Sequence, residues 1–143
     1  MRQIFISLSI NTTDMKVLKI GGSIISDGDG KLNNNRIKSI VELVESRDDI
    51  SGIVVGGSIA REYINSGEEL NLDTDDLDNL GINVTHLNAK LFEMFLDDFT
   101  FSKTLSNIET NKVIMGGTEP GHTTDAVSIM LAEKLGSDEV YAA

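Results

Sequence analysis

Glycine pairs are the feature of this sequence whose spacing points most directly to chemistry. Each of three pairs follows a short apolar run: Gly21–Gly22 after residues 16–20, Gly56–Gly57 after residues 53–55, and Gly116–Gly117 after residues 113–115. A glycine pair after a strand lets backbone N–H groups approach an anion without obstruction by Cβ, and a following helix N-terminus adds a favourable dipole. A single pair more simply makes a tight turn. Three pairs in 143 residues favour phosphate binding.

Three charged residues stand beside these pairs. Lys19 directly precedes the first pair, where its long side chain would reach a transferring phosphoryl group; the alternative is a solvated lysine at a strand end. Arg61 follows the second pair and suits bidentate phosphate binding, or else a surface ion pair with a nearby Glu. Asp125 begins the helix expected after the third pair, where it would cap that helix, orient Lys19 or bind a metal.

Several other phosphate and metal motifs are excluded by their spacing. Gly30–Lys31 lacks the upstream glycine of a P-loop, and no G-x-G-x-x-G is present. Residues 27–30 resemble the start of a calcium loop, but lysines occupy its third and last ligand positions, so a hairpin turn is the better interpretation. His86 and His122 have no Cys or second His at ligand spacing. We therefore predict no metal held by protein ligands.

The hydrophobic pattern alternates strands with helices. Strands are expected at 16–20, 53–55 and 113–115 and from 139, and residues 97–111 predict a loop with at most a short helix. A helix capped by the polar residues 33–35 should follow the first strand, and a helix should follow each of the other glycine pairs. One long helix over 75–96 should bury a stripe of apolar residues at steps of three and four: Leu77, Leu80, Val84, Leu87, Leu91 and Met94.

This alternation predicts an α/β fold of three layers, αβα, with a mostly parallel sheet covered by helices on both faces. In such sheets the ligands bind beyond the carboxyl ends of the strands, and all three glycine pairs are expected at that edge.

Composition narrows the partners. With 40% apolar and 24% charged residues the chain is ordinary for one globular domain, and its net charge of -11 argues against a nucleic-acid polymer. No stretch reaches transmembrane length, so we expect no membrane partner. The absence of cysteine fits a reducing compartment, and the cytoplasm is the expected location.

Four blocks of the sequence resemble, in order and spacing, the archaeal-type uridylate (UMP) kinases of the amino acid kinase family. They are VLKIGGS (17–23), VVGGSIAREYI (54–64), LDNLGINVTHLNAKL (77–91) and, most specifically, IMGGTEPGHTTDAVSIMLAEKL (114–135). The resemblance implies the amino acid kinase fold, which is carbamate kinase-like, and the transfer of the ATP γ-phosphate to UMP to give UDP in pyrimidine nucleotide biosynthesis. It also implies Mg²⁺ carried by the substrate phosphates, and a homohexamer.

The resemblance also implies a role for individual residues. Lys19 matches the transition-state lysine and Asp125 the carboxylate that organises the catalytic lysines. The donor ATP phosphates would be bound by Gly21, Gly22, Ser23, Ser58 and Arg61. UMP would be bound by Gly56, Gly57, Asp78, Thr118, Glu119, Pro120, Gly121, His122, Thr123 and Thr124. Within this set, Asp78 matches the acceptor of the ribose hydroxyls, residues 118–124 match the loop around the pyrimidine and acceptor phosphate, and Arg61 also borders that phosphate.

The resemblance begins near Met15 and runs to Ala143. Residues 1–14 have no counterpart in it and are expected to be an N-terminal extension, whereas residues 15–143 match the N-terminal, acceptor-binding part of the kinase domain. The family continues into a C-terminal half that carries the ATP base site and is missing here, so the chain alone is expected to be inactive. The second glycine loop also departs from the family, because Ser58 stands where a third glycine is usual.

Two other functions stay open. Related enzymes of the family phosphorylate isopentenyl phosphate, acetylglutamate or carbamate, although the isopentenyl phosphate enzymes carry a His in the second glycine loop, which here reads GGSIAR. The chain could also be a non-catalytic binding or oligomerisation module of the same fold. Retention of Lys19, Arg61 and Asp125 together favours a kinase.

Overall fold

The computed structural model describes residues 15–108 and 112–143. The expected extension, residues 1–14, lies outside the described residues. The elements follow one another as β1 (Lys16–Ile20), α1 (Gly22–Ile25), α2 (Asn34–Glu45), β2 (Ile50–Val55), α3 (Ala60–Glu69), α4 (Thr74–Glu93), β3 (Thr100–Phe101), β4 (Val113–Met115), α5 (Thr124–Leu135) and β5 (Glu139–Ala142). The predicted alternation of strands and helices is confirmed.

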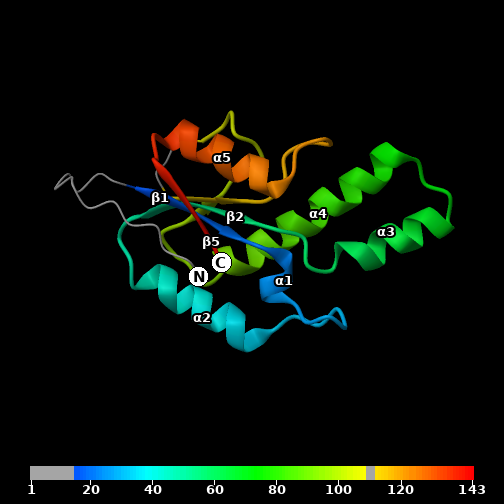
Figure 1. The fold of residues 1–143 in the computed structure, drawn as a ribbon, viewed down its shortest axis with the longest axis horizontal. Helices are drawn as coiled ribbons and strands as arrows, with labels where there is room; N and C mark the ends of the chain where they lie inside the picture. Colours follow the sequence, from blue (N-terminus) through cyan, green and yellow to red (C-terminus); the bar gives the residue numbers. More distant parts are fainter. Residues whose placement is uncertain (1–14, 109–111) are drawn as a thin grey trace.

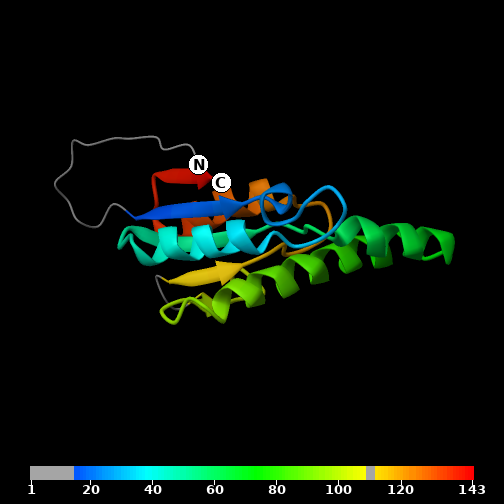
Figure 2. The ribbon, with the colours of Figure 1, turned by 90° about the horizontal axis from the view of Figure 1, so that it is seen from below.

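A single parallel sheet organises these elements. Its strands lie in the order β3-β4-β2-β1-β5, and every neighbouring pair is parallel. Helix α5 covers one face, while α2 and α4 cover the other (Figures 1 and 2). The three-layer αβα fold is therefore confirmed. Helix α3 and the first half of α4 project beyond the carboxyl edge of the sheet as an antiparallel pair, which Figures 1 and 2 both show.

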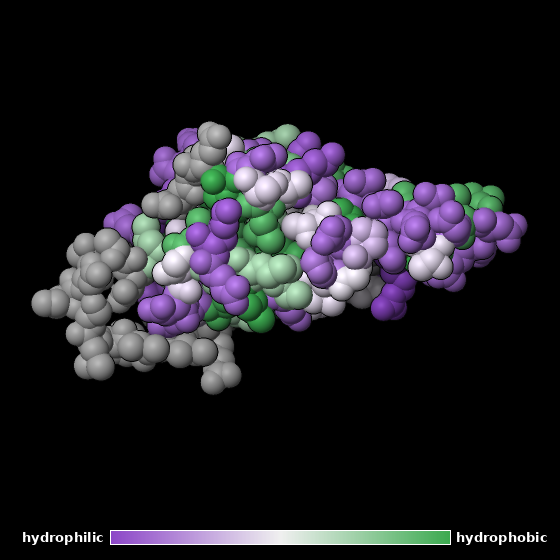
Figure 3. Space-filling view, turned by 90° about the horizontal axis from the view of Figure 1, so that it is seen from above, coloured by the Kyte–Doolittle hydropathy of each residue, from purple (hydrophilic) through white to green (hydrophobic). Residues whose placement is uncertain are grey.

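Alternation along the strands divides the core between the two faces. On β1, Leu18 and Ile20 pack toward α2 and α4, whereas Val17 packs toward α5. Lys19 has the parity of Val17 and so faces the α5 layer. Gly52 on β2 lies under α5 at such close range that a Cβ there would be 2.8 Å from Leu131 Cδ2. Figure 3 shows hydrophobic patches among hydrophilic ones on the surface viewed from above. Ile129 of α5 is 55% exposed.

Two local predictions are confirmed. Asn33 caps α2, because its side-chain oxygen accepts a hydrogen bond from Arg36 N at 3.0 Å. Residues 27–30 form a hairpin turn, in which Asp27 N donates to Lys31 O at 2.8 Å and an antiparallel bridge joins Ser26 to Leu32.

The loop predicted over residues 97–111 is wrong in one respect, because it contains the edge strand β3. Two residues are too few to show an alternating pattern. A side chain helps to hold the strand: Glu93 Oε2 at the end of α4 accepts a hydrogen bond from Phe101 N at 2.6 Å.

The stripe predicted to be buried on α4 is correct only in part. The helix forms close to its predicted bounds, Val84 is buried and Leu91 packs against the core, but Leu87 is 60% exposed and Met94 is 76% exposed. The buried residues of α4 are Val84, Thr85, His86, Asn88, Ala89 and Phe92. The buried side thus contains polar residues, whose side chains form hydrogen bonds with backbone groups of the glycine loops.

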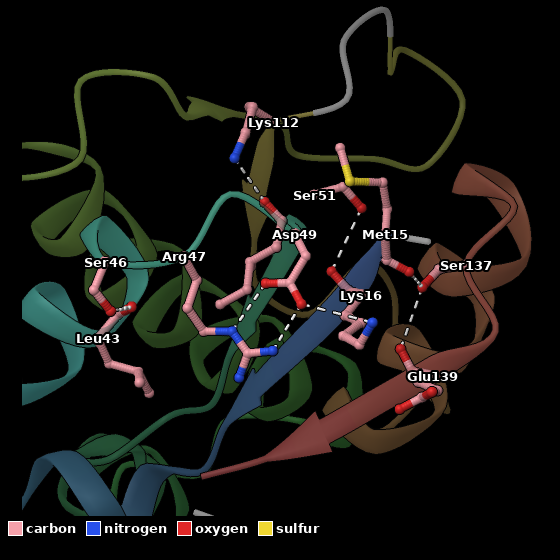
Figure 4. A network of polar contacts seen from close by, with 11 residues as sticks. Met15, Lys16, Leu43, Ser46, Arg47, Asp49, Ser51, Lys112, Ser137 and Glu139 are labelled. Carbon is pink, nitrogen blue, oxygen red and sulfur yellow. Dashed lines mark hydrogen bonds and ion pairs between the residues drawn. The ribbon is translucent and has the colours of Figure 1, made fainter. Parts of the chain in front are cut away.

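A network of charged residues ties together the amino ends of the strands, far from the glycine pairs (Figure 4). Asp49 accepts hydrogen bonds from Arg47 Nε at 2.9 Å and Nη2 at 2.7 Å, and Lys16 Nζ lies 3.6 Å from the same carboxylate. The Arg47 guanidinium also stacks over Tyr141 of β5 at 5.2 Å. Three strands are therefore linked by one carboxylate and its partners. Arg47 holds the pKa of Asp49 below its usual value near 3.8.

We predict that Asp49→Asn lowers the free energy of unfolding by about 1–2 kcal/mol at pH 7, because the two Arg47 bonds lose their ionic partner. Urea denaturation measures the change. Asp48→Asn is the matched control, since Asp48 is the exposed neighbour and should change stability by less than about 0.5 kcal/mol.

The pH dependence has a defined sign. The lowered pKa of Asp49 contributes stability that is complete above the carboxyl's unfolded pKa and disappears as the pH falls through the folded pKa. The gap in stability between wild type and Asp49→Asn should therefore narrow between pH 5 and acid pH. A gap that stays constant down to acid pH would contradict the assigned ion pair.

Candidate active site

The three glycine pairs meet at the carboxyl edge of the sheet. They follow β1, β2 and β4, which are adjacent and parallel, with Ile20 opposite Val55 and Val54 opposite Met115. The predicted common edge is confirmed.

The first two glycine loops touch through their backbones. A Cβ added to Gly22 would lie 3.0 Å from the carbonyl carbon of Gly57, and one added to Gly56 would lie 2.9 Å from Gly22 N. Real Cβ atoms essentially never show the 2.9 Å distance, and the 3.0 Å distance is tighter than nine in ten real Cβ contacts. Glycine is thus required for the two loops to pack against each other, a reason separate from the approach of an anion.

A cleft opens between these loops and the start of α3. Its volume is about 830 Å³, and its lining includes Gly22, Ser23, Gly57, Ser58 and Arg61. Ile59 precedes α3 without making a side-chain cap, so the first N–H groups of this helix are left without a side-chain partner. An exposed guanidinium and an uncapped helix N-terminus on one cleft suit an anionic group.

Lys19 and Asp125 meet at the end of β1. The Lys19 Nζ lies 3.1 Å from Asp125 Oδ1, on the α5 side of the sheet. The lysine side chain is only 19% exposed, whereas the aspartate is 78% exposed. Because water solvates the carboxylate, such a pair contributes little to stability and can open at low cost. Of the three roles considered for Asp125, orienting Lys19 is the one that this contact fits.

The capping role considered for Asp125 belongs to another residue. Thr123 is the N-cap of α5, and its side-chain oxygen accepts a hydrogen bond from Ala126 N at 3.0 Å. Asp125 lies in the first turn of the helix instead. The sequence T-T-D offers three capping residues in succession, so propensity alone could not choose among them.

Residues 118–124 comprise the loop that leads from the third glycine pair to α5, together with Thr124, the first residue of that helix. Glu119, Pro120, Gly121, His122 and Thr123 are exposed, and the His122 Nδ1 lies 3.3 Å from Glu119 Oε1. Thr118 differs from them, because its hydroxyl is buried and has no hydrogen-bond partner among the described residues. An orphaned hydroxyl at the base of an exposed loop is suited to a ligand that brings its own polar group.

The structure does not bring every predicted residue to the cleft. Asp78 is exposed on the second turn of α4 and is not among the residues that line the cleft. It lies seven residues before Thr85, which corresponds to about 10 Å along the helix axis. The site therefore has three parts along one edge: the cleft, the Lys19–Asp125 pair, and the loop 118–124.

Three residues to which the sequence analysis assigned no role in the site contact its glycine loops: Asn88, Thr85 and His86. Asn88 Nδ2 donates to Gly56 O at 3.0 Å and to Ser58 Oγ at 3.2 Å. Thr85 and His86 form hydrogen bonds with the backbone of Gly117. A signal was present, because polar residues at 85 and 88 fall one helical turn apart within a pattern otherwise read as apolar.

Residues 15–108 and 112–143 contain no group of three or more His, Cys, Asp or Glu side chains arranged to hold a metal ion. None of the helices in the same ranges combines the length and apolar character needed to cross a membrane.

Comparison with known proteins identifies the family. The model of the amino acid kinase family matches residues 14–143. The chain belongs to this family. Among its amino acid kinase relatives, the uridylate kinase of Natronomonas pharaonis is 37% identical over 134 residues, and that of Methanobrevibacter smithii is 39% identical over 132 residues. These alignments cover 85% and 87% of this chain.

Two solved structures share the fold. The uridylate kinase of Archaeoglobus fulgidus superposes with a TM-score of 0.78 at 34% identity, over 90% of this chain and 63% of that one. The UMP kinase of Bacillus anthracis, at 22% identity and a TM-score of 0.69, supports the fold alone. The chain spans 58% and 59% of the length of the first two curated relatives.

We predict that Gly56→Ala destabilises the folded chain by about 1–3 kcal/mol, because the new methyl group meets the backbone of the first glycine loop. Thermal and urea denaturation measure the loss. Gly28→Ala is the matched control, since a Cβ at Gly28 meets nothing within 4 Å. Equal stability of the two variants would show that the glycine loops do not pack as described.

Proposed function

We propose that this chain is the acceptor-binding part of a UMP kinase, which transfers the ATP γ-phosphate to UMP and forms UDP for pyrimidine nucleotide biosynthesis. The observation that carries the proposal is the contact between Lys19 Nζ and Asp125 Oδ1 at 3.1 Å, beside the glycine loops. Uridylate kinases among the relatives support the choice of acceptor. Solved isopentenyl phosphate kinases share the fold at 18% identity, which does not bear on the substrate.

The acceptor nucleotide is proposed to lie along the carboxyl edge. The loop 118–124 would enclose the pyrimidine and the acceptor phosphate, and the unpartnered Thr118 hydroxyl supports this because a ligand group could satisfy it. Gly56 and Gly57 would bring backbone close to the phosphate. Asp78, exposed on the projecting part of α4, would accept hydrogen bonds from the ribose hydroxyls.

The donor phosphates are proposed to occupy the cleft between the first two glycine loops. Gly21, Gly22, Ser23 and Ser58 would supply backbone and hydroxyl groups, and Arg61 would supply charge. The uncapped N-terminus of α3 on the same cleft supports this placement. Mg²⁺ is expected to arrive on these phosphates and to neutralise part of their charge.

The chemical step needs no general base. An oxygen of the UMP phosphate, already largely deprotonated at neutral pH, forms a bond to the γ-phosphorus of ATP. The bond between that phosphorus and the β,γ-bridging oxygen breaks, and ADP leaves. Negative charge spreads over the transferring oxygens, and Lys19 is the fixed cation placed to stabilise it. Asp125 would direct the Lys19 side chain toward the sheet edge.

Assembly stays a prediction from the resemblance, and location stays a prediction from composition. A homohexamer is compatible with the exposed apolar side chains Leu87, Met94 and Phe95 on and just after α4, which a partner subunit could cover. A cytoplasmic location follows only from composition.

We predict that the chain binds UMP more tightly than AMP. The loop 118–124 and Asp78 lie within these 143 residues, whereas the resemblance places the adenine site outside them. Titration calorimetry with the two nucleotides under identical conditions measures the difference. Equal affinity would contradict the assignment of an acceptor site.

We further predict that Lys19→Met, in a chain extended to the length of the uridylate kinases, lowers kcat by roughly 10²-fold or more. Affinity for UMP should change little, because the lysine acts on charge that develops in the transition state. Lys38→Met is the control for loss of a positive charge, since Lys38 is exposed on α2. Near-normal turnover in Lys19→Met would refute the role of this lysine.

A further inference from the structure

Consecutive residues of α4 hold both backbone polar groups of Gly117, the N–H of one peptide group and the C=O of the next. Thr85 Oγ1 accepts a hydrogen bond from Gly117 N at 2.7 Å, and His86 Nε2 donates to Gly117 O at 2.7 Å. Both side chains are buried, at 6% and 8% exposure. Gly117 is the last residue before the loop 118–124, so these bonds set the direction in which that loop leaves the sheet.

The hydrogen bond to Gly117 also determines the tautomer of His86. A carbonyl oxygen can only accept, so the proton must sit on Nε2, and Nδ1 carries a lone pair. This Nδ1 is buried and has no hydrogen-bond partner among the described residues. Burial lowers the pKa of His86, and the nearby Lys103 and Lys90 lower it further, against the opposing effect of the Gly117 bond. The ring is therefore neutral at physiological pH.

The same part of α4 contacts the second glycine loop. Asn88 Nδ2 donates to Gly56 O, and a Cβ on Gly57 would lie 3.3 Å from Thr85 Cγ2. Thr85 also closes on the third pair, because a Cβ on Gly116 would lie only 2.3 Å from its Oγ1. One turn of helix thus determines the spacing of two loops that lie on opposite sides of the proposed UMP phosphate.

We propose that His86, with Thr85, is a positioning residue for the nucleoside monophosphate. The two side chains fix the backbone of Gly117 and thereby the acceptor loop, without touching the nucleotide. This inference rests on the proposed function of the loop. The hydrogen bonds that fix the Gly117 backbone do not depend on that function and are tested separately.

The first test compares two substitutions of His86 in UMP binding. His86→Leu removes the donor to Gly117 O, leaves a buried carbonyl unpaired, and should weaken UMP binding in calorimetry by about tenfold. His86→Gln keeps an amide N–H close to the position of Nε2 and should restore affinity to within about threefold of wild type. Leu87→Ala, at the exposed neighbouring position on α4, is the matched control and should bind UMP as wild type does.

Thr85→Val repeats the test at the other backbone group of Gly117, its N–H. The substitution preserves shape but removes the acceptor of Gly117 N–H, so UMP binding should again weaken by about tenfold. This variant decides the matter if His86→Leu fails to fold.

The second test measures the hydrogen bonds of Gly117 directly, without a nucleotide. In ¹⁵N NMR spectra the His86 ring of the wild-type chain should show a protonated Nε2 and a bare Nδ1 at neutral pH. Amide hydrogen exchange at Gly117 reports the bond to Thr85 and should be at least tenfold faster in Thr85→Val than in wild type. The carbonyl ¹³C chemical shift of Gly117 reports the bond from His86, so it should change in His86→Leu and stay close to wild type in His86→Gln.

The two tests separate the two ideas. If wild type binds no UMP but the exchange and the carbonyl shift of Gly117 behave as expected, the positioning contact stands and the proposed function fails. If UMP binds and neither His86→Leu nor Thr85→Val changes its affinity, the exchange or the carbonyl shift at Gly117, the positioning role is overturned. Weaker UMP binding in His86→Gln to the same extent as in His86→Leu would also overturn it, because the donated hydrogen bond would then not be the cause.

Discussion

Close contact between glycine backbones at one sheet edge is the constraint on which the rest of the site depends. Parallel pairing brings the ends of β1, β2 and β4 to the same edge, and the first two loops then approach until no Cβ fits between Gly56 and Gly22 N. The third loop is pressed equally closely against Thr85. Every other group with a proposed chemical role, from Lys19 to the loop 118–124, is placed relative to these contacts.

Helix α4 explains how this edge is kept in register. Its buried side exchanges some apolar packing for hydrogen bonds to Gly56 and Gly117, which satisfy backbone groups that the ends of the strands leave unpaired. Leu87 and Met94 face solvent because they fall on the side of the helix turned away from Thr85, Asn88 and Phe92. The amino ends of the strands rely on a different device, the ion pairs around Asp49.

Much of the fold could be predicted because strand and helix periods are local. Neighbouring residues alone determine the apolar runs before the glycine pairs, the Asn33 cap and the turn at residues 27–30. Predictions failed where the outcome depended on distant partners. The buried side of α4 depends on backbone groups about 30 residues away, and β3 depends on an edge that β4 offers. Of the candidate site, the common edge and the Lys19–Asp125 contact follow from topology, whereas the place of Asp78 relative to the cleft does not.

The unequal exposure of Lys19 and Asp125 has a consequence for the nucleotide-free protein. Lys19 is mostly withdrawn from water, and without a counter-ion its charge would be poorly compensated. Asp125 supplies that counter-ion while itself remaining hydrated, so an incoming phosphate competes with a carboxylate instead of filling a vacant cationic site. In the proposed function, a polyphosphate with several charges competes better for Lys19 than a singly charged anion such as chloride does. Asp125 would then keep Lys19 paired until such a ligand displaces it.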